Sequence, residues 1–238
     1  DIYSANSFQP PMTIGTVQAS PLTMANVYAT MGANGVECTP IAITKVTDRS
    51  GSKVKVPSAN CHQAIDPDIA QTVSYALNQG VVQPGGEAST TQLDNNRKTF
   101  AKTGTNENTV MTTAGFVPNQ VAAFVAVADA QDPINNTFDN KTINGVYRPS
   151  WYGMYIATPA WKQFMNTYLA AINAPIDNDY GKGADKYTVS KGATRTYNQY
   201  QYQRQQNSQQ QSQQQTNQGQ QQQSQQQPAE QQSDQQHQ

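Results

Sequence analysis

A cation, two hydroxyls and a glycine follow one another in Lys102-Thr103-Gly104-Thr105, at the end of an apolar run. The rhythm of this stretch predicts a β-strand in which Thr103 and Thr105 share one face, while Lys102 and Gly104 share the other. A lysine beside hydroxyls suits an anionic group such as a carboxylate, and a glycine lets a ligand backbone approach closely. The four residues therefore predict a carboxylate-binding edge strand. The alternative is an ordinary edge strand with a solvated lysine and two threonines.

Helices must flank this strand, and three runs predict them because each opens on a capping residue followed by proline. The openings are Ser20-Pro21, Asp66-Pro67 and Thr158-Pro159, and the first two helices should end near Gly35 and Gly80. The spacing of apolar residues predicts which side chains of the second and third helices are buried. They are Ile69, Val73, Ala76 and Leu77, and then Trp161, Phe164, Met165, Tyr168 and Leu169.

Three short apolar runs, at residues 98–103, 110–117 and 121–128, predict an antiparallel meander that contains the lysine strand. Strands and helices in this order predict an α+β fold, in which an antiparallel sheet is packed with helices.

Cys38 and Cys61 flank a further strand, turn and strand, predicted over residues 41–46, 48–51 and 53–56. A disulfide between them would close the base of this hairpin and would indicate an oxidising compartment. We predict this bond; two buried free thiols are the alternative.

Composition divides the chain into three parts, predicted as a folded domain over 1–175, a linker over 176–196 and a tail over 197–238. The tail is rich in glutamine and poor in aliphatic residues, which predicts disorder and a role as a spacer in preference to self-association. A formal net charge of −1 gives no footprint for nucleic acid. The chain begins at Asp1 without an apolar run that could cross a bilayer, so we expect a piece of a longer protein whose anchor lies upstream.

Lys-Thr-Gly is the third signature of the serine acyltransferases that react with penicillin. Here it stands as KTGT, after the helix SPLTMANVYATMGANGV, the predicted hairpin, a second helix and the glycine-rich loop QPGGEAST. Over residues 10–169 this order resembles the C-terminal portion of the transpeptidase domain of class A, bifunctional penicillin-binding proteins. Within that family the resemblance is to Gram-positive enzymes, with actinobacteria as the narrower expectation.

The resemblance implies catalytic roles for Lys102 and Thr105. Lys102 would hold the substrate carboxylate and the proton network, and the backbone N–H of Thr105 would be an oxyanion-hole donor. Thr103, Gly104 and Thr105 would bind the terminal carboxylate end of a D-Ala-D-Ala stem peptide or a β-lactam. The implied reaction is acyl transfer through a serine ester, without metal or cofactor.

The resemblance also implies a place for the parent protein. It would lie on the outer face of the cell membrane, held by the upstream anchor, among other cell-wall synthesis proteins. Two departures from the family pattern stand near the motif. Ala101 replaces a frequent glycine, and TTAGF follows where the family has Asp-x-Trp-Phe-x-Gly.

The family's other signatures, Ser-x-x-Lys and Ser-x-Asn, have literal matches at residues 52–55, 58–60 and 4–6. A Ser-x-x-Lys pair works at the start of a helix, where residues three apart share a face, whereas in a strand they lie on opposite faces. Ser52 leads into a predicted strand, so we expect it not to be a nucleophile. The sequence thus predicts a chain with the KTGT strand and without the reacting serine, which would lie upstream. A non-catalytic peptidoglycan-binding or scaffolding module is the alternative.

Two other groups of residues have simpler interpretations. His62 and His237 have no partners at metal-ligand spacing, which predicts no metal site. Trp151, Tyr152, Tyr155 and Trp161 form an aromatic group for which core packing is favoured over a carbohydrate platform.

Overall fold

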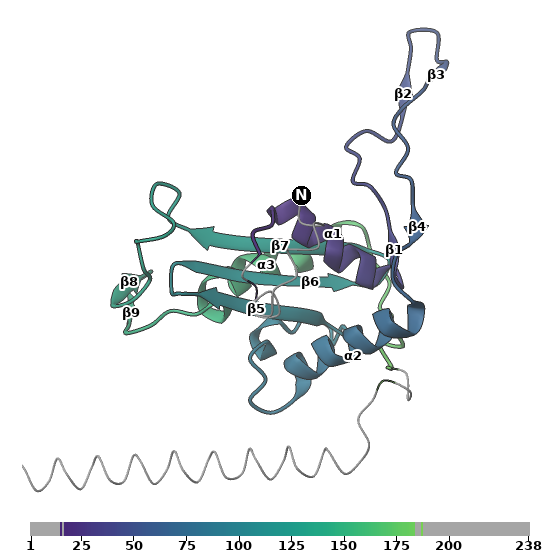
Figure 1. Cartoon of the computed structure of the whole chain (residues 1–238). Helices are drawn as coiled ribbons and strands as arrows, with labels where there is room; N and C mark the ends of the chain where they lie inside the picture. The colour runs from purple at the N-terminus through teal and green to yellow at the C-terminus, as the bar shows by residue number, and fades with distance from the viewer. Residues whose placement is uncertain (1–14, 16, 184–186, 188–238) are drawn as a thin grey trace, which may run out of the picture. The chain divides into compact units, whose positions relative to one another are not determined.

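The computed structural model describes residue 15, residues 17–183 and residue 187 (Figure 1). Contacts divide the chain at Thr188, and every described residue lies in the first unit, Asp1–Thr188. The predicted glutamine-rich tail, the serine match at residues 4–6 and His237 lie outside the described residues.

The first two helices begin where the sequence predicts. Helix α1 spans Pro21–Gly32, and the Ser20 hydroxyl accepts an N–H of its first turn. Helix α2 spans Pro67–Val82, and the carboxylate of Asp66 accepts the N–H of Asp68 at 2.8 Å. Side-chain caps of this kind satisfy N–H groups that the first turn leaves without a partner.

The buried face of α2 differs from the prediction. Its buried side chains are Ala70, Ser74, Asn78 and Val81, whereas the predicted Ile69, Val73 and Ala76 are exposed. The Asn78 amide donates to the carbonyl of Thr99 at 3.0 Å, and the Ser74 hydroxyl bonds within the helix. Small and hydrogen-bonded side chains therefore face the sheet, because a buried polar group with a partner carries little penalty.

The predicted meander is confirmed. Strands β5 (Phe100–Asn106), β6 (Val110–Val117) and β7 (Val121–Ala128) form an antiparallel sheet in the order β5-β6-β7. Lys102 pairs with Ala114 across the sheet. Among the described residues β5 has a strand partner on one side only, so it is an edge strand.

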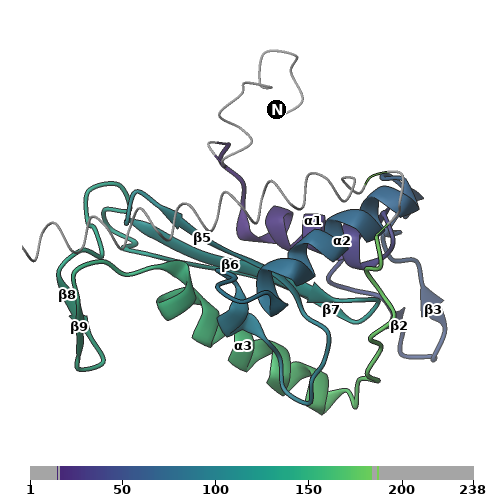
Figure 2. The same cartoon turned by 90° about the horizontal axis from the view of Figure 1, so that it is seen from below.

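Helices cover both faces of this sheet, which confirms the predicted α+β class. Helix α3 lies on one face, and α1 and α2 lie on the other (Figure 2). Helix α3 spans Gly153–Ala171, so it begins well before the predicted start at Thr158 and contains Pro159. The prediction was wrong because the Thr158 hydroxyl does not cap a helix; it is hydrogen-bonded to the hydroxyl of Thr113 on β6 at 2.9 Å.

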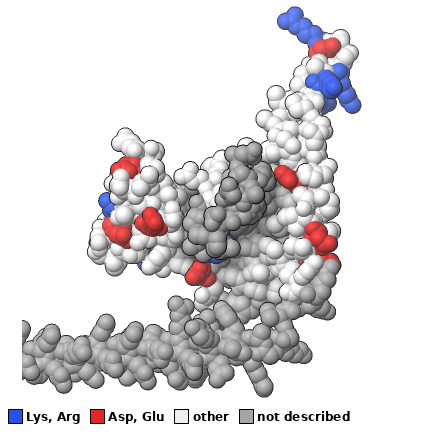
Figure 3. All heavy atoms as spheres, in the orientation of Figure 1, with Lys and Arg blue, Asp and Glu red and all other residues white. Residues whose placement is uncertain are grey.

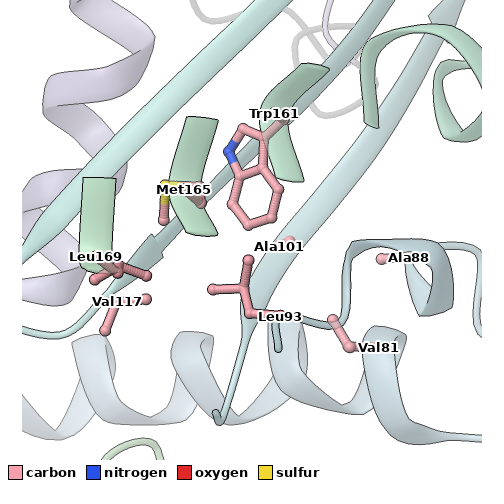
Figure 4. Packing of buried hydrophobic residues seen from close by; sticks show 8 residues of the cluster. All are labelled: Val81, Ala88, Leu93, Ala101, Val117, Trp161, Met165 and Leu169. Carbon is pink, nitrogen blue, oxygen red and sulfur yellow. The ribbon is translucent and has the colours of Figure 1, made fainter. Parts of the chain in front are cut away.

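The core of the described residues has three clusters: one around Trp161 of α3, one around Phe100, and a third formed by Met111, Trp151 and Ala157. Trp161, Met165 and Leu169 of α3 are buried as predicted, whereas Phe164 and Tyr168 are exposed. Figure 4 shows the α3 cluster, which comprises Val81, Ala88, Leu93, Ala101, Val117, Trp161, Met165 and Leu169. On the opposite face the rings of Phe100 and Phe116 stack with their centroids 4.9 Å apart.

Within residues 176–183, which the sequence assigns to the linker, Tyr180 and Gly181 are buried against this second cluster. The ring of Tyr180 lies edge-on to Phe100, and its hydroxyl donates to the carbonyl of Met31 and accepts the N–H of Asn34. Lys98 donates to the carbonyl of Tyr180 at 2.6 Å. The chain after α3 is therefore part of the packed domain as far as it is described.

The small strands form pairs outside the main sheet. β1 (Val36–Glu37) pairs with β4 (His62–Gln63), and β2 (Val46–Thr47) pairs with β3 (Lys53–Val54), so the predicted hairpin is present with shorter strands. A disulfide joins Cys38 and Cys61 at its base. The remaining elements are the short helix η2 (Ser89–Thr91) and the pair β8 (Lys141–Ile143) and β9 (Val146–Arg148).

Candidate active site

Lys102 lies on the edge strand with its side chain about half exposed, at 56%. Its ammonium donates to the carbonyl of Thr103 at 2.6 Å and lies 3.5 Å from the carboxylate of Glu87. An ammonium has three N–H groups, so one donor of Lys102 is left for a further acceptor.

The two threonines of the motif lie on the opposite face, as the alternation predicts. Thr103 is 8% exposed, and its hydroxyl donates to the carbonyl of Glu87 at 3.4 Å. Thr105 is exposed, and its hydroxyl oxygen accepts the backbone N–H of Gly153 at 3.1 Å. Because the Thr105 oxygen is the acceptor in this bond, its proton is available to an anionic ligand.

The bond to Thr105 brings the first residue of helix α3 against the motif. The N-cap residue of this helix is Tyr152, and its side chain makes no capping hydrogen bond. The Thr105 hydroxyl instead takes one of the N–H groups that a helix start leaves unpaired. The positive end of the α3 dipole therefore lies at the motif, where it favours negative charge.

This close contact requires a glycine at position 153. A Cβ at Gly153 would lie 2.4 Å from the carbonyl oxygen of Gly104 and 2.5 Å from that of Thr112. Both are backbone atoms, which cannot rotate away as a long side chain can. Gly153 therefore lets the backbone of α3 approach the strand that carries the motif.

The sequence predicted neither Glu87 nor Gly153 as part of this site. A signal existed for Glu87, which is the one acidic residue between Asp68 and Asp94 and lies in the glycine-rich loop before the motif. The only signal for Gly153 was a glycine at the start of an aromatic run, and the predicted helix start at Thr158 placed it outside the helix.

The serine matches at residues 52–55 and 58–60 lie outside helices, as does Ser50, which Lys53 follows three residues later. Ser52 ends the turn between β2 and β3, where its N–H donates to the Asp48 carboxylate at 2.9 Å. Ser58 lies in the extended connection before Cys61, and its hydroxyl accepts the N–H of Asn60 at 3.2 Å. Ser52 therefore lacks the helical setting that a Ser-x-x-Lys nucleophile needs, and the Ser-x-Asn match at Ser58 lies in a connection between strands.

The aromatic residues near α3 divide between core and surface. Trp151 and Trp161 are buried, while Tyr152 and Tyr155 are 47% and 37% exposed. The guanidinium of Arg148 lies 3.9 Å from the centroid of the Tyr155 ring. This cation–π contact holds the exposed Tyr155 ring against Arg148 near the start of α3.

The described part of the chain meets the requirements of neither a metal site nor a membrane-spanning helix. His62 lies 3.8 Å from the carboxylate of Glu37, and both side chains are exposed. The described residues contain no group of three or more side chains able to hold a metal ion. Nor does any described helix have the length and apolar character needed to cross a bilayer.

Fold and site place the chain among α+β proteins with a Lys-Thr-Gly-Thr edge strand packed between helices. The family model described as the penicillin binding protein transpeptidase domain matches residues 3–165. The chain therefore belongs to the penicillin-binding protein transpeptidase domain family.

Relatives and solved structures agree with this assignment. Penicillin-binding protein 1A of Neisseria gonorrhoeae is 30% identical over 167 residues, and that of Mycolicibacterium smegmatis is 27% identical over 168 residues. Each match covers 66% of this chain but only 19% and 20% of the relative, so the chain spans about a fifth of these proteins.

The likeness to solved structures concerns the fold. PonA1 of Mycobacterium tuberculosis in complex with penicillin V has a TM-score of 0.60 at 22% identity, covering 74% of this chain and 44% of that one. Penicillin binding protein 3 of the same organism, complexed with ampicillin, has a TM-score of 0.51 at 19% identity, covering 69% and 37%.

Proposed function

We propose that this chain is the C-terminal part of a D,D-transpeptidase domain, which cross-links peptidoglycan stem peptides and binds β-lactams. Its role in that enzyme is to supply one wall of the active site, the β5 edge with Lys102 and Thr105. The observation that carries the proposal is the arrangement of Thr105. Its oxygen is held by the N–H of Gly153, and its proton is left for a substrate carboxylate.

The chemistry of carboxylate binding follows from these groups. The Thr105 hydroxyl donates one hydrogen bond, and the start of α3 adds a favourable dipole. Lys102 leaves β5 on the opposite face, but its long side chain bends back to the Thr103 carbonyl, and its ammonium supplies positive charge at the strand edge. Hydrogen bonds to charged groups contribute about 1.5–3 kcal/mol each, so loss of one donor should weaken recognition about 10- to 150-fold. Thr103 can take part only by exchanging its bond to the Glu87 carbonyl. A Cβ at Gly104 would lie 2.3 Å from the hydroxyl oxygen of Thr112, so the glycine leaves room for that side chain beside the motif.

Transition-state stabilisation is the second task of this strand. In an antiparallel edge strand, alternate backbone N–H groups point away from the neighbouring strand. We assign the N–H of Thr105 as an oxyanion donor. Removal of one such donor typically lowers kcat by about 10²- to 10³-fold.

The reaction proceeds in two acyl transfers. A serine oxygen attacks the penultimate carbonyl of one stem peptide, its proton passes to a base, and the terminal D-Ala leaves as the amine. An amine of a second stem peptide then attacks the serine ester and releases the serine. We assign this serine to sequence upstream of Asp1, because Ser50 and Ser52, the described serines that a lysine follows three residues later, lie outside helices. The whole protein would then act at the outer face of the membrane.

Covalent labelling with fluorescent penicillin, read by intact mass, tests this proposal. The samples are the 238-residue chain and a form extended upstream by one domain. We expect the extended form alone to be labelled, and its K102A variant to lose labelling while K141A keeps it. Labelling at Ser52 would refute the assignment of the nucleophile. Silence from both forms would favour the scaffolding alternative.

A further inference from the structure

The segment from Cys38 to Cys61, here called the finger, projects from the domain (Figure 1). Its base is closed by the disulfide and by the pairing of β1 with β4. All residues from 42 to 55 are exposed, so the outer part of the finger buries no side chain in the core. Burial of apolar side chains therefore does not explain why the chain forms this disulfide-closed element, and its exposed surface is the feature to explain.

The outer finger is strongly cationic. Residues 42–55 include four cations and one carboxylate, within a chain whose formal net charge is −1. The cations are Lys45, Arg49, Lys53 and Lys55, and Figure 3 shows basic side chains gathered at this end of the molecule. None of the four forms an ion pair with another described residue.

The single carboxylate, that of Asp48, is engaged by the turn itself. It accepts the side-chain hydroxyl of Ser50 at 2.6 Å and the N–H groups of Ser50 and Ser52 at 2.8 and 2.9 Å. These bonds hold the pKa of Asp48 below its ordinary value, the Ser50 hydroxyl contributing most. The carboxylate therefore shapes the turn and does not pair with the neighbouring cations.

The paired valines and the lysine opposite Thr47 lie on opposite faces of the finger. Val46 pairs with Val54, and Thr47 pairs with Lys53. Because alternate residues share a face, Lys53 lies on the Thr47 face and the two valines lie on the other. Lys45 and Lys55 lie one residue beyond the ends of β2 and β3, and the same alternation, continued by one residue, assigns both to the Thr47 face.

We propose that the finger binds an anionic polymer with repeated phosphate or carboxylate groups, laid along the face formed by Lys45, Lys53 and Lys55. Several charges in a row favour a repeating polyanion over a single small anion. A bilayer surface fits less well, because it would have to contact lysines and valines on opposite faces at once. Single-stranded nucleic acid fits less well too, since residues 38–61 contain no aromatic side chain for base stacking.

The test measures binding of the full chain to inorganic polyphosphate and to poly-L-glutamate by fluorescence anisotropy, over about 50–200 mM salt. The probe variant is K45Q/K53Q/K55Q. Its matched control is K141Q/K162Q/K182Q, which removes the same charge from exposed or half-exposed lysines outside the finger. Since all the probe positions are exposed, loss of folding should not confound the result.

We expect the finger variant to raise the Kd at least about tenfold and to flatten its salt dependence, while the control stays within about twofold. Tighter binding of polyphosphate than of poly-L-glutamate at equal charge would identify phosphate as the ligand chemistry, and the reverse would identify carboxylate. Equal losses in both variants, or no binding at the lowest salt, would overturn the proposal. Finger-dependent binding to phosphatidylglycerol vesicles without binding to either polymer would overturn it in favour of a membrane.

Discussion

Replacement of Gly153 by alanine should disturb the contact between α3 and the KTGT strand. The added Cβ would lie 2.4 Å from one backbone oxygen and 2.5 Å from another. Favourable contacts begin near about 3.5 Å, so the two backbones must separate by roughly 1 Å. Overpacking of this kind costs about 1–3 kcal/mol.

Gly80 provides a matched control for this substitution. It lies within α2, and a Cβ there would meet nothing within 4 Å. Alanine stabilises a helix relative to glycine by about 1 kcal/mol. Gly80→Ala should gain all of this stability, and Gly153→Ala should gain no more than the same amount. The difference in free energy of unfolding between the two variants should therefore be about 1–3 kcal/mol, with Gly153→Ala the less stable.

Urea unfolding followed by tryptophan fluorescence measures this difference. Trp151 and Trp161 are the only tryptophans, and both lie buried close to α3 or within it. The extended form should also show slower penicillin labelling for Gly153→Ala than for Gly80→Ala, because Thr105 loses the N–H that holds its oxygen. A Gly153→Ala variant as stable as Gly80→Ala would refute the close-approach argument.

Two further predictions concern other contacts. Glu87→Gln removes the carboxylate that lies 3.5 Å from the Lys102 ammonium and that, under the proposed function, would compete with the substrate for it. Exposed ion pairs contribute about 0.2–1 kcal/mol, so penicillin labelling of the extended form should become about 1.5- to 5-fold faster, whereas Glu107→Gln on the next turn should change nothing. Tyr180→Phe removes the hydroxyl that donates to the carbonyl of Met31 and accepts the N–H of Asn34; because these two groups also bond to each other at 3.2 Å, the free energy of unfolding should fall by about 0.5–1.5 kcal/mol. Burial raises the pKa of Tyr180, so the wild-type advantage should be complete below about pH 10 and decline as the pH rises through the higher folded-state pKa. Urea midpoints of both proteins across this range measure it, and an unchanged gap would contradict the assigned role.

Local signals in the sequence predicted the elements well. The cap residues Ser20 and Asp66 fixed the starts of α1 and α2, and the bounds of β6 and β7 coincide with the predicted runs. Alternation along β5 correctly separated Lys102 from Thr103. These features depend on neighbours in the chain, which is why pattern alone could find them.

Features that depend on tertiary contacts were missed. The buried face of α2 is set by the bond from Asn78 to Thr99, a contact between distant segments, and no apolar periodicity reports it. Gly153 acquires its role only because Gly104 lies opposite. The β8–β9 hairpin is different, because the dipeptide Asn144-Gly145 is a local sequence signal for it; both residues have positive φ, as a tight hairpin turn requires.

The most direct test of the account is the carboxylate preference of the β5 edge. Acylation rates of the extended form would be compared for benzylpenicillin and its methyl ester, in wild type, Thr105→Val and Thr105→Ser. We expect wild type and Thr105→Ser to prefer the free carboxylate, and Thr105→Val to lose about 10- to 150-fold of that preference. An unchanged preference in Thr105→Val would contradict the assignment of this strand as the carboxylate-binding wall.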